Sequence, residues 1–467
     1  MNLETLDAVT WSIGCCSAIF IRLFQGGYVD SIFLFSLLVM SWILHLLNNR
    51  PQFRQGAGHG VVCGFLSVPS AVAVLNSHHL HSALTVDFIF CLLFIISPYL
   101  VPTTDFRFSI VIPILVTLLF YTITNEDLIV LSCTVLLGLF VLTCLMKYAP
   151  GSFSIGEFVM VSTLSSLPVR SIFELSDHLS IQRFSAIFIT FGVLCLSLSL
   201  LIKRPIVIFI VLFAFILSYR EIPTVISYVM NLKRLYLVAY CGIVCIIFIF
   251  ISAHWKGLQS FPQIIQRKFF HLMALLVFVP PVLIDYHFLR LCISGAIFVF
   301  LFVESLRIVR FPYVASLFES YVSGFIDERD SNELILTHLF LLLGLGLPVL
   351  LADVTVPGSL AVHVAGISVL AVGDAMASIC GVYYGRHKWP GSKKSYEGTA
   401  GAFFGTWLTM AIIQAIAVRG VPWREWLCLL LPAIIGALDE AFTSQIDNLT
   451  LPFVMIPPIV SAFFFLS

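Results

Sequence analysis

The chain has 467 residues, of which 60% are hydrophobic and only 11% are charged, with a mean hydropathy of +1.04. Soluble domains carry roughly 25% charged residues, so this composition excludes a soluble globular protein. The 25 basic residues balance the 25 acidic ones, so the net charge is zero and gives no electrostatic attraction to nucleic acid. The stretch 206–217 is apolar at every position, which argues against the alternating strands of a β-barrel. We therefore expect an all-α fold, a polytopic transmembrane helical bundle.

Apolar stretches bounded by polar residues, proline or glycine predict the spans in chain order. Each spanning helix needs about 20 apolar residues, so we expect about 15–17 spans. The stretches lie near 7–24, 31–47, 60–75, 84–101, 108–123, 128–146, 154–170, 184–202, 205–219, 235–253, 268–284, 288–305, 334–351, 359–381, 400–417, 425–443 and 449–466. The stretch 154–170 is rich in serine and 205–219 is short, so either could be re-entrant or interfacial.

The two halves of the chain differ in where their charges lie. Residues 1–255 hold no cluster of catalytic-type residues, and we expect a multi-span region that acts as scaffold or faces lipid. Over 256–467, charged and glycine-rich groups gather at span ends, where ionisable residues are functional candidates. We therefore expect a catalytic membrane domain over 256–467. Alternate loops are rich in Lys and Arg, and the positive-inside rule then places the loop at about 385–401 in the cytoplasm.

The densest signal is this glycine-rich loop, in which four basic side chains accompany one acid. Glycines let backbone N–H groups approach an anion closely, and Ser and Thr hydroxyls add donors. The segment 397–399 precedes an apolar run, so a helix N-terminus could face the same anion. We interpret the loop as a cradle for a polyphosphate. The alternative is a basic loop that only meets lipid headgroups and sets topology.

Acidic residues near the ends of spans suggest a cation site. Asp374 lies inside an apolar run beside small residues, so we expect it to pair with a cation, bind a metal or be neutralised by helix partners. A second group, Asp439 and Glu440, is followed by Asp447 and Asn448, and Glu440 and Asp447 share a face if the helix continues. Carboxylate oxygens suit Mg²⁺, so Asp374, Glu440 and Asp447 are candidate ligands for Mg²⁺ or another divalent cation. A solvated loop is the alternative for the second group.

Two weaker clusters lie at the ends of other spans. Arg267, Lys268 and His271 open one span, where they could instead anchor the topology. Glu304 and Arg307 close another span, and because they are three positions apart they could satisfy each other within the helix. The histidines within 78–81 are expected to be interfacial, and the charged run 327–330 is expected to be a solvated turn.

The run 373–401, together with 440–442 and 447–452, resembles the dolichol kinases. These belong to a wider group with phytol kinases and other CTP-using lipid kinases, related to the phosphatidate cytidylyltransferases. The cluster 267–271 and the pair Glu304 and Arg307 fit the same pattern, and the resemblance covers roughly 256–467. It implies CTP-dependent phosphorylation of the terminal hydroxyl of dolichol in the endoplasmic reticulum membrane. The products would be CDP and dolichyl phosphate, the lipid carrier for protein glycosylation.

The resemblance also implies which residues form the site. The residues that correspond to the CTP-binding segment are Gly385, Arg386, Lys388, Gly391, Ser392, Lys393, Lys394, Ser395, Glu397, Gly398 and Thr399. Lys393 and Lys394 would hold the β- and γ-phosphates, because phosphoryl transfer requires neutralisation of phosphate charge. The catalytic candidates are Lys394, Asp374 and Glu440, with one of the two acids receiving the proton of the lipid hydroxyl. Residues that could support the site are Arg267, Lys268, His271, Glu304, Arg307 and Asn448.

Three other functions compete with a dolichol kinase. A CTP-using kinase could act on phytol or another lipid, and a cytidylyltransferase would release pyrophosphate from CTP instead of CDP. A multi-pass transporter would also contain buried charges, but the chain shows no inverted repeat with paired broken helices. The expected partners are a polyprenol such as dolichol, CTP and the bilayer, without nucleic acid, and the oligomeric state is left open.

Overall fold

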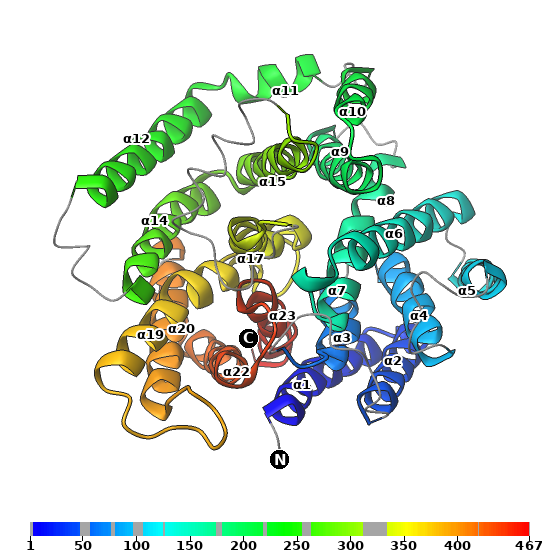
Figure 1. Cartoon of the computed structure of the whole chain (residues 1–467). Coiled ribbons are helices and arrows are strands. Elements are labelled where there is room, and N and C mark those ends of the chain that lie inside the picture. Colours follow the sequence, from blue (N-terminus) through cyan, green and yellow to red (C-terminus); the bar gives the residue numbers. More distant parts are fainter. Residues whose placement is uncertain are drawn as a thin grey trace. The chain divides into compact units, whose positions relative to one another are not determined.

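The structure is a computed structural model that describes residues 3–46, 57–75, 80–96, 106–124, 127–173, 180–217, 222–254, 263–311, 334–418 and 420–466. The run 327–330 and the histidines at 78 and 79 lie outside these residues, as do the side chains of Arg267 and His81. Within the described part the regular elements are helices, with one isolated β-bridge (Figure 1), so the all-α expectation is confirmed.

The helices follow one another along the whole described chain. Their bounds are α1 Leu3–Phe24, α2 Tyr28–Leu46, α3 Val61–Val74, α4 Leu80–Ile96, α5 Phe106–Thr124, α6 Leu128–Tyr148, η1 Pro150–Ser152, α7 Ile155–Ser166, α8 Pro168–Phe173, α9 Ser180–Ile202, α10 Ile206–Leu217, α11 Ile222–Val229, α12 Leu232–His254, α14 Gln263–Ile284, α15 Tyr286–Ile308, α17 Thr337–Leu351, α18 Ser359–His363, η4 Ile367–Gly373, α19 Asp374–Tyr383, α20 Tyr396–Ala417, α21 Trp423–Cys428, α22 Leu430–Phe442 and α23 Asp447–Leu466.

Eight of the described helices are long and apolar enough to cross a membrane. They are α1, α2, α6, α9, α12, α15, α20 and α23. Five further apolar segments are shorter, at 10–17 residues: Val61–Val74, Ile155–Ser166, His271–Ile284, His338–Leu351 and Ile367–Tyr383. The expected polytopic bundle is therefore confirmed. Among the described residues, the eight long helices and the five shorter segments are fewer than the expected 15–17 spans.

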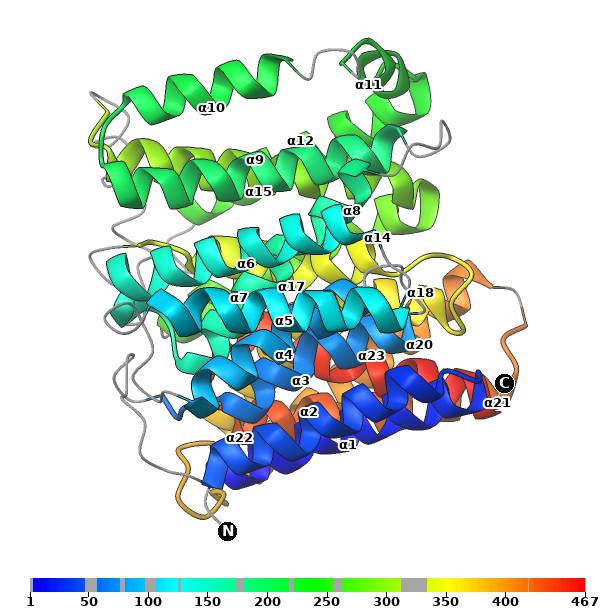
Figure 2. The same ribbon diagram turned by 90° about the vertical axis from the view of Figure 1, so that its right-hand side faces the viewer.

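The contacts between residues divide the chain into two compact units. The first unit contains Met1–Ile21, Ile226–Arg290 and Leu343–Ser467, and the second contains Arg22–Val225 and Leu291–Leu342. In the first unit, most of α1 accompanies the C-terminal helices (Figure 2). The sequence-based boundary at residue 255 concerns function, which these contacts do not test, and it stays a prediction.

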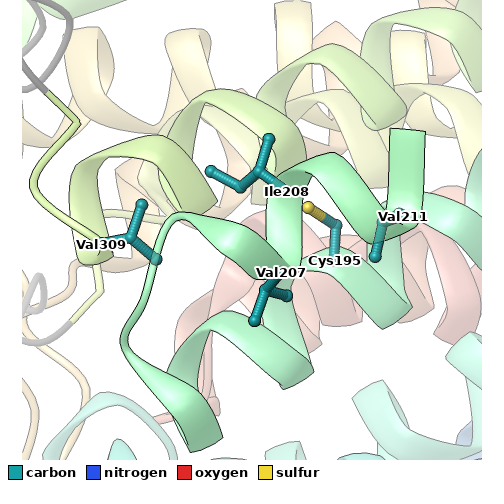
Figure 3. Packing of buried hydrophobic residues seen from close by; sticks show 5 residues of the cluster. All are labelled: Cys195, Val207, Ile208, Val211 and Val309. Carbon is teal, nitrogen blue, oxygen red and sulfur yellow. The ribbon is translucent and has the colours of Figure 1, made fainter. Parts of the chain in front are cut away.

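In the second unit, close helix packing depends on small residues and on a small apolar cluster. Helix α3 packs on α7 where Gly64 and Gly156 meet backbone to backbone, with no room for a Cβ on either. Helices α9 and α10 and the end of α15 enclose a cluster of Cys195, Val207, Ile208, Val211 and Val309 (Figure 3).

Glu304 and Arg307, expected as possible support for the site, form the alternative pairing with each other at the end of α15 in the second unit. Arg307 donates to both carboxylate oxygens of Glu304, with its Nε 2.9 Å from Oε2 and one terminal nitrogen 2.6 Å from Oε1. Glu304 also accepts from the backbone N–H of Ile335 at 2.8 Å, and it is buried. The two side chains thus satisfy each other within one helix, as the three-residue spacing predicted.

In the first unit, α20 is the central helix, packed against η4, α19 and α22. Gly401 and Gly405 lie four residues apart on its buried face. A Cβ on Gly401 would lie only 2.8 Å from the carbonyl oxygen of Met376, and one on Gly405 would lie 3.0 Å from the Met376 Cγ. This is the small-residue packing that lets membrane helices approach closely, and it holds α19 against α20. The end of α19 and the start of α20 are thereby brought together.

Candidate active site

Asp374 stands at a change of helix geometry. The segment η4 is π-helical over seven residues, and it passes directly into α19, whose first residue is Asp374. The π-helix is rare in proteins, and where it occurs it is often at a functional site. It leaves carbonyl groups outside the regular α-helical hydrogen-bond pattern. Here the carbonyl of Leu370 in η4 accepts a hydrogen bond from the Nδ1–H of His271 at 2.8 Å. The irregular turn therefore provides a docking point for α14 beside Asp374.

The partner of Asp374 is a lysine from α14. Lys268 Nζ forms an ion pair with the Asp374 carboxylate, and their side chains are 14% and 9% exposed. His271, one turn further along α14, lies 3.6 Å from the same carboxylate oxygen. The sequence allows a cation, a metal or neutral partners for Asp374, and predicts only a supporting role for Lys268 and His271. The structure brings these three side chains together.

The basic loop between α19 and α20 is a short hairpin. Lys388 and Ser395 form an antiparallel bridge, and the N–H of Trp389 donates to the carbonyl of Lys394 at 3.0 Å. The indole of Trp389 packs on Tyr396 with ring centroids 3.9 Å apart, and meets Phe442 edge-on at 4.9 Å. This aromatic anchor gives the loop a defined path back to α20 and attaches it to the end of α22.

Four residues predicted to bind CTP have structural contacts in this hairpin. Ser395 caps α20 by accepting from the N–H of Gly398 at 3.1 Å. Thr399 accepts from the indole N–H of Trp389 at 2.9 Å, and its own hydroxyl donates to the Ser395 carbonyl at 3.1 Å. Glu397 meets the ring of His387 at 2.6 Å and accepts from its backbone N–H at 3.2 Å. These residues therefore shape the loop, whatever they also do for a nucleotide.

The remaining loop residues present basic groups to solvent. Arg386, Lys388 and Lys393 are exposed. The loop turns at Gly391, which has a φ of +75° that favours glycine, and Ser392 Oγ accepts from the Lys394 N–H at 3.1 Å. Gly385 lies so close to the Gly381 carbonyl that a side chain would not fit. The exposed cations and the tight turn are compatible with a phosphate cradle.

Lys394 differs from its neighbours because it reaches a buried acid. Its Nζ forms an ion pair with Glu440 of α22; the Glu440 side chain is 5% exposed, whereas that of Lys394 is 45% exposed. Burial works to lower the pKa of Lys394, but the carboxylate of Glu440, helped by Asp447 and Asp374, raises it above its ordinary value. Lys394 is thus a permanent cation between solvent and a buried carboxylate.

The acids predicted as metal ligands gather by a turn and not along one helix. Helix α22 ends at Phe442 and α23 begins at Asp447, so Glu440 and Asp447 do not share a helix face. The turn nevertheless brings them into electrostatic contact with each other and with Asp374. Asn448 donates its backbone N–H to Asp447 Oδ1 at 2.9 Å. The three predicted acids, with Lys268 and Lys394, thus make one charged group in the first unit.

The carboxylates at this site limit how a metal ion could be bound. Among the described residues, no group of three or more His, Cys, Asp or Glu side chains is arranged to hold a metal. Asp374 and Glu440 each face a lysine instead. Mg²⁺ commonly takes only one or two carboxylates and completes its shell with water and substrate phosphates. The residues therefore fit an ion that arrives with a phosphate-bearing substrate better than one held in a protein cage.

One buried acid in the same unit was not predicted from the sequence. It is Asp7 of α1. Asp7 is 3% exposed and Asp439 is 0% exposed. A lone carboxylate in an apolar span was the signal, as it was for Asp374. It was not used because no second charged motif accompanies it in the N-terminal half.

Comparison with known proteins identifies relatives over about half of the chain. The chain is 36% identical to the human dolichol kinase over 238 residues, which cover 48% of this chain and 44% of that protein. It is 32% identical to dolichol kinase EVAN of Arabidopsis thaliana over 226 residues, and 32% identical to dolichol kinase sec59 of Schizosaccharomyces pombe over 192 residues. These cover 48% and 41% of this chain and 40% and 38% of the respective relatives. The resemblance to dolichol kinases is confirmed, with the match spanning less than half of each relative's length. No family model and no solved structure matches the chain.

Proposed function

We propose that the chain phosphorylates the terminal hydroxyl of dolichol with CTP, giving dolichyl phosphate and CDP. The similarity to dolichol kinases supports the reaction class. The observation that carries the proposal is the contact of Lys394 with Glu440, which joins the basic hairpin to the buried acids. A polyphosphate needs such cations, and a hydroxyl that must lose a proton needs a carboxylate that can accept it.

The basic hairpin would bind the nucleotide. Arg386, Lys388 and Lys393 are exposed and free to turn toward phosphate oxygens. Lys394 stays protonated, so it can move its contact from Glu440 to the γ-phosphate without any change of charge. That movement would uncover the carboxylate of Glu440 when the nucleotide is in place.

The reaction itself would require few moving groups. The dolichol oxygen forms a bond to the γ-phosphorus, the bond from that phosphorus to the β-phosphate oxygen breaks, and CDP leaves. The hydroxyl proton passes to the carboxylate of Asp374 or Glu440. Lys268 holds Asp374 in place, while Lys394 balances charge on the transferred group. One or two of the candidate carboxylates, Asp374, Glu440 and Asp447, would hold a Mg²⁺ ion that enters with CTP, and the ion would supply neutralisation of phosphate charge.

The apolar helices support the proposed substrate and location. A polyprenol would remain in the bilayer beside these helices, with only its alcohol at the charged group. We propose the endoplasmic reticulum membrane as the site of action, with the hairpin in the cytoplasm where CTP is available. The distribution of Lys and Arg supports that orientation.

A donor test with the purified full chain in detergent would check this function. Dolichol and Mg²⁺ are supplied with CTP or ATP labelled in the γ-phosphate, and labelled lipid is measured. We expect transfer from CTP, and a loss of about 10²–10³-fold in kcat for Lys394→Ala, as for removal of one charge-stabilising group. Lys233→Ala is the matched control, because Lys233 is an exposed lysine of the same unit whose Nζ donates to the Ile284 carbonyl.

Three results would contradict the proposal. With CTP labelled in the α-phosphate, label in the lipid and release of pyrophosphate would identify a cytidylyltransferase. Transfer to phytol but not to dolichol would identify a different lipid kinase. Lipid or solute flux in liposomes without nucleotide turnover would identify a transporter.

A further inference from the structure

Helix α14 contains a proline pair at 280–281, and α12 is bound to the helix at this point. Proline has no N–H, so the pair cannot donate to the carbonyls four positions earlier, those of Leu276 and Val277. The hydroxyl of Tyr240 in α12 donates to the Leu276 carbonyl at 3.1 Å. The thiol of Cys241 donates to the Val277 carbonyl at 3.6 Å. Side chains of α12 therefore satisfy both carbonyls that the prolines leave free, and they fix α12 beside α14 (Figure 1).

A groove with a volume of about 450 Å³ lies between α12 and α14 beside the proline pair. The aromatic and aliphatic side chains that line it are Tyr236, Leu237, Tyr240, Pro280 and Ile284. Pockets for small molecules commonly have about 300–1,000 Å³ and such apolar linings. The side chains of Tyr236 and Ile284 are 67% and 45% exposed, so the groove can be entered from the lipid around the protein.

The cations beside the groove are already engaged by the protein. Lys233, which borders the groove, donates from its Nζ to the Ile284 carbonyl at 3.0 Å. Arg234 forms an ion pair with Asp285 at 2.8 Å, and its Cζ lies 3.3 Å from the centre of the Tyr228 ring. An anionic lipid head would need a cation that is not already bound in this way. The groove therefore suits an uncharged apolar chain better than the head of a phospholipid.

The groove and the candidate active site lie along the same helix. Lys268, near the start of α14, forms the ion pair with Asp374. From Lys268 to Ile284 is 16 positions, about 24 Å at a rise of 1.5 Å per residue. Next to Lys268, Phe269 packs on Phe248 of α12 with ring centroids 4.6 Å apart, so α12 follows α14 from the site to the groove. A lipid whose hydroxyl lies at Asp374 can occupy the groove only if its chain is long.

We propose that the groove between α12 and α14 binds the isoprenoid chain of the polyprenol substrate, at a distance from the hydroxyl that reacts. The identity of the substrate rests on the proposed kinase function, but binding of a polyprenol chain can be measured without phosphoryl transfer. Contacts with a remote part of a substrate favour only those substrates that have that part. The groove thereby selects long polyprenols over short isoprenoid alcohols.

The kinetic test compares dolichol with farnesol, a short isoprenoid alcohol, using the full chain in detergent with CTP. Ile284→Trp fills the groove from a partly exposed position. A misfit of one methylene in an apolar pocket is already worth about 10-fold, so we expect kcat/KM to fall about 10-fold for dolichol and to stay unchanged for farnesol. Ile246→Trp is the matched control, because Ile246 is an isoleucine of α12 that is 68% exposed and does not line the groove.

Two kinetic results would overturn the proposal. An equal fall for both alcohols would show a general disturbance of the enzyme, and an unchanged kcat/KM for dolichol would show that the groove takes no part in binding. If Ile284→Trp does not fold, Tyr236→Ala replaces it, because this change removes an exposed wall of the groove and adds no volume. The same loss for dolichol alone is expected of Tyr236→Ala.

A photocrosslinking measurement without nucleotide keeps this inference separate from the proposed function. A polyprenol with a diazirine in its last isoprene unit is irradiated with the full chain, and linked peptides are identified by mass spectrometry. We expect links within α12 and the end of α14, reduced several-fold by excess dolichol and by Ile284→Trp but not by Ile246→Trp. Links spread evenly over the other spans, or links that a phospholipid displaces and dolichol does not, would refute the groove as a polyprenol site. A chain that binds the probe in the groove but phosphorylates no lipid would refute the function alone.

Discussion

Removal of Lys268 isolates the contribution of its ion pair with Asp374. In Lys268→Ala the Asp374 carboxylate, 9% exposed, loses its charged partner and keeps only His271 at 3.6 Å. Breaking a buried pair by removing one member costs about 3–5 kcal/mol, because the other charge remains out of water. We take about 3 kcal/mol, since Lys268 is itself 14% exposed.

The assay is thermal unfolding of the purified chain in detergent. In a cooperative unit of about 150–250 residues, 1 kcal/mol shifts Tm by about 2–4 °C, so Lys268→Ala should melt about 6–12 °C below wild type. The exposed Lys233→Ala should change stability by less than about 1 kcal/mol. Adding Asp374→Asn to Lys268→Ala removes the stranded charge and should recover most of the loss.

Two results would refute this reasoning. If Lys268→Ala has the same Tm as wild type, then the ion pair does not contribute to stability. If the double variant is as unstable as Lys268→Ala alone, then the loss comes from the lysine's packing and not from an unpaired carboxylate. The double variant should recover stability without recovering kinase activity, because it lacks Asp374, a proposed catalytic acid.

Three further predictions concern the hairpin and its support. Trp389→Ala removes the aromatic anchor, so limited trypsin digestion should cut the loop at least several-fold faster than in wild type, whereas Trp389→Phe should stay close to it. Gly401→Leu must separate α19 from α20, because a Cβ at this position would already lie 2.8 Å from a carbonyl oxygen. We therefore expect loss of folded protein in size-exclusion chromatography. Gly242→Leu is the control, because nothing lies within 4 Å of a Cβ at that position. The pKa of Lys394 is raised above 10.5 by Glu440, so the stability that this pair supplies is complete at lower pH and is lost only as pH rises through the raised value. The difference in Tm between wild type and Lys394→Met should therefore be constant from about pH 7 to 9, and a difference that falls over that range would contradict the assignment.

Part of the site was predictable because charge in an apolar chain is conspicuous. Asp374 and Glu440 lie in stretches that favour the membrane interior, and the hairpin collects basic residues within a few positions. Such signals depend only on neighbours along the chain. The same reasoning, applied to Asp7, would have identified it as a candidate as well.

The pairing of these charges was not predictable. Lys268 and Asp374 are 106 positions apart and Lys394 and Glu440 are 46 apart, so no local spacing relates them. Glu397 was expected to face the nucleotide, yet it contacts His387 and fastens the hairpin to α20. Such contacts depend on how closely helices approach, which glycines on α20 decide through packing.

The sequence by itself determined that this chain is a bundle of membrane helices with its scarce charges concentrated near its C-terminal half, because hydropathy and local charge are properties of short segments. Only the tertiary structure decided that Asp374 faces Lys268 and that Glu440 faces Lys394. The physical reason is that a buried charge must be compensated by whatever group the fold brings beside it, and the fold brings distant segments together.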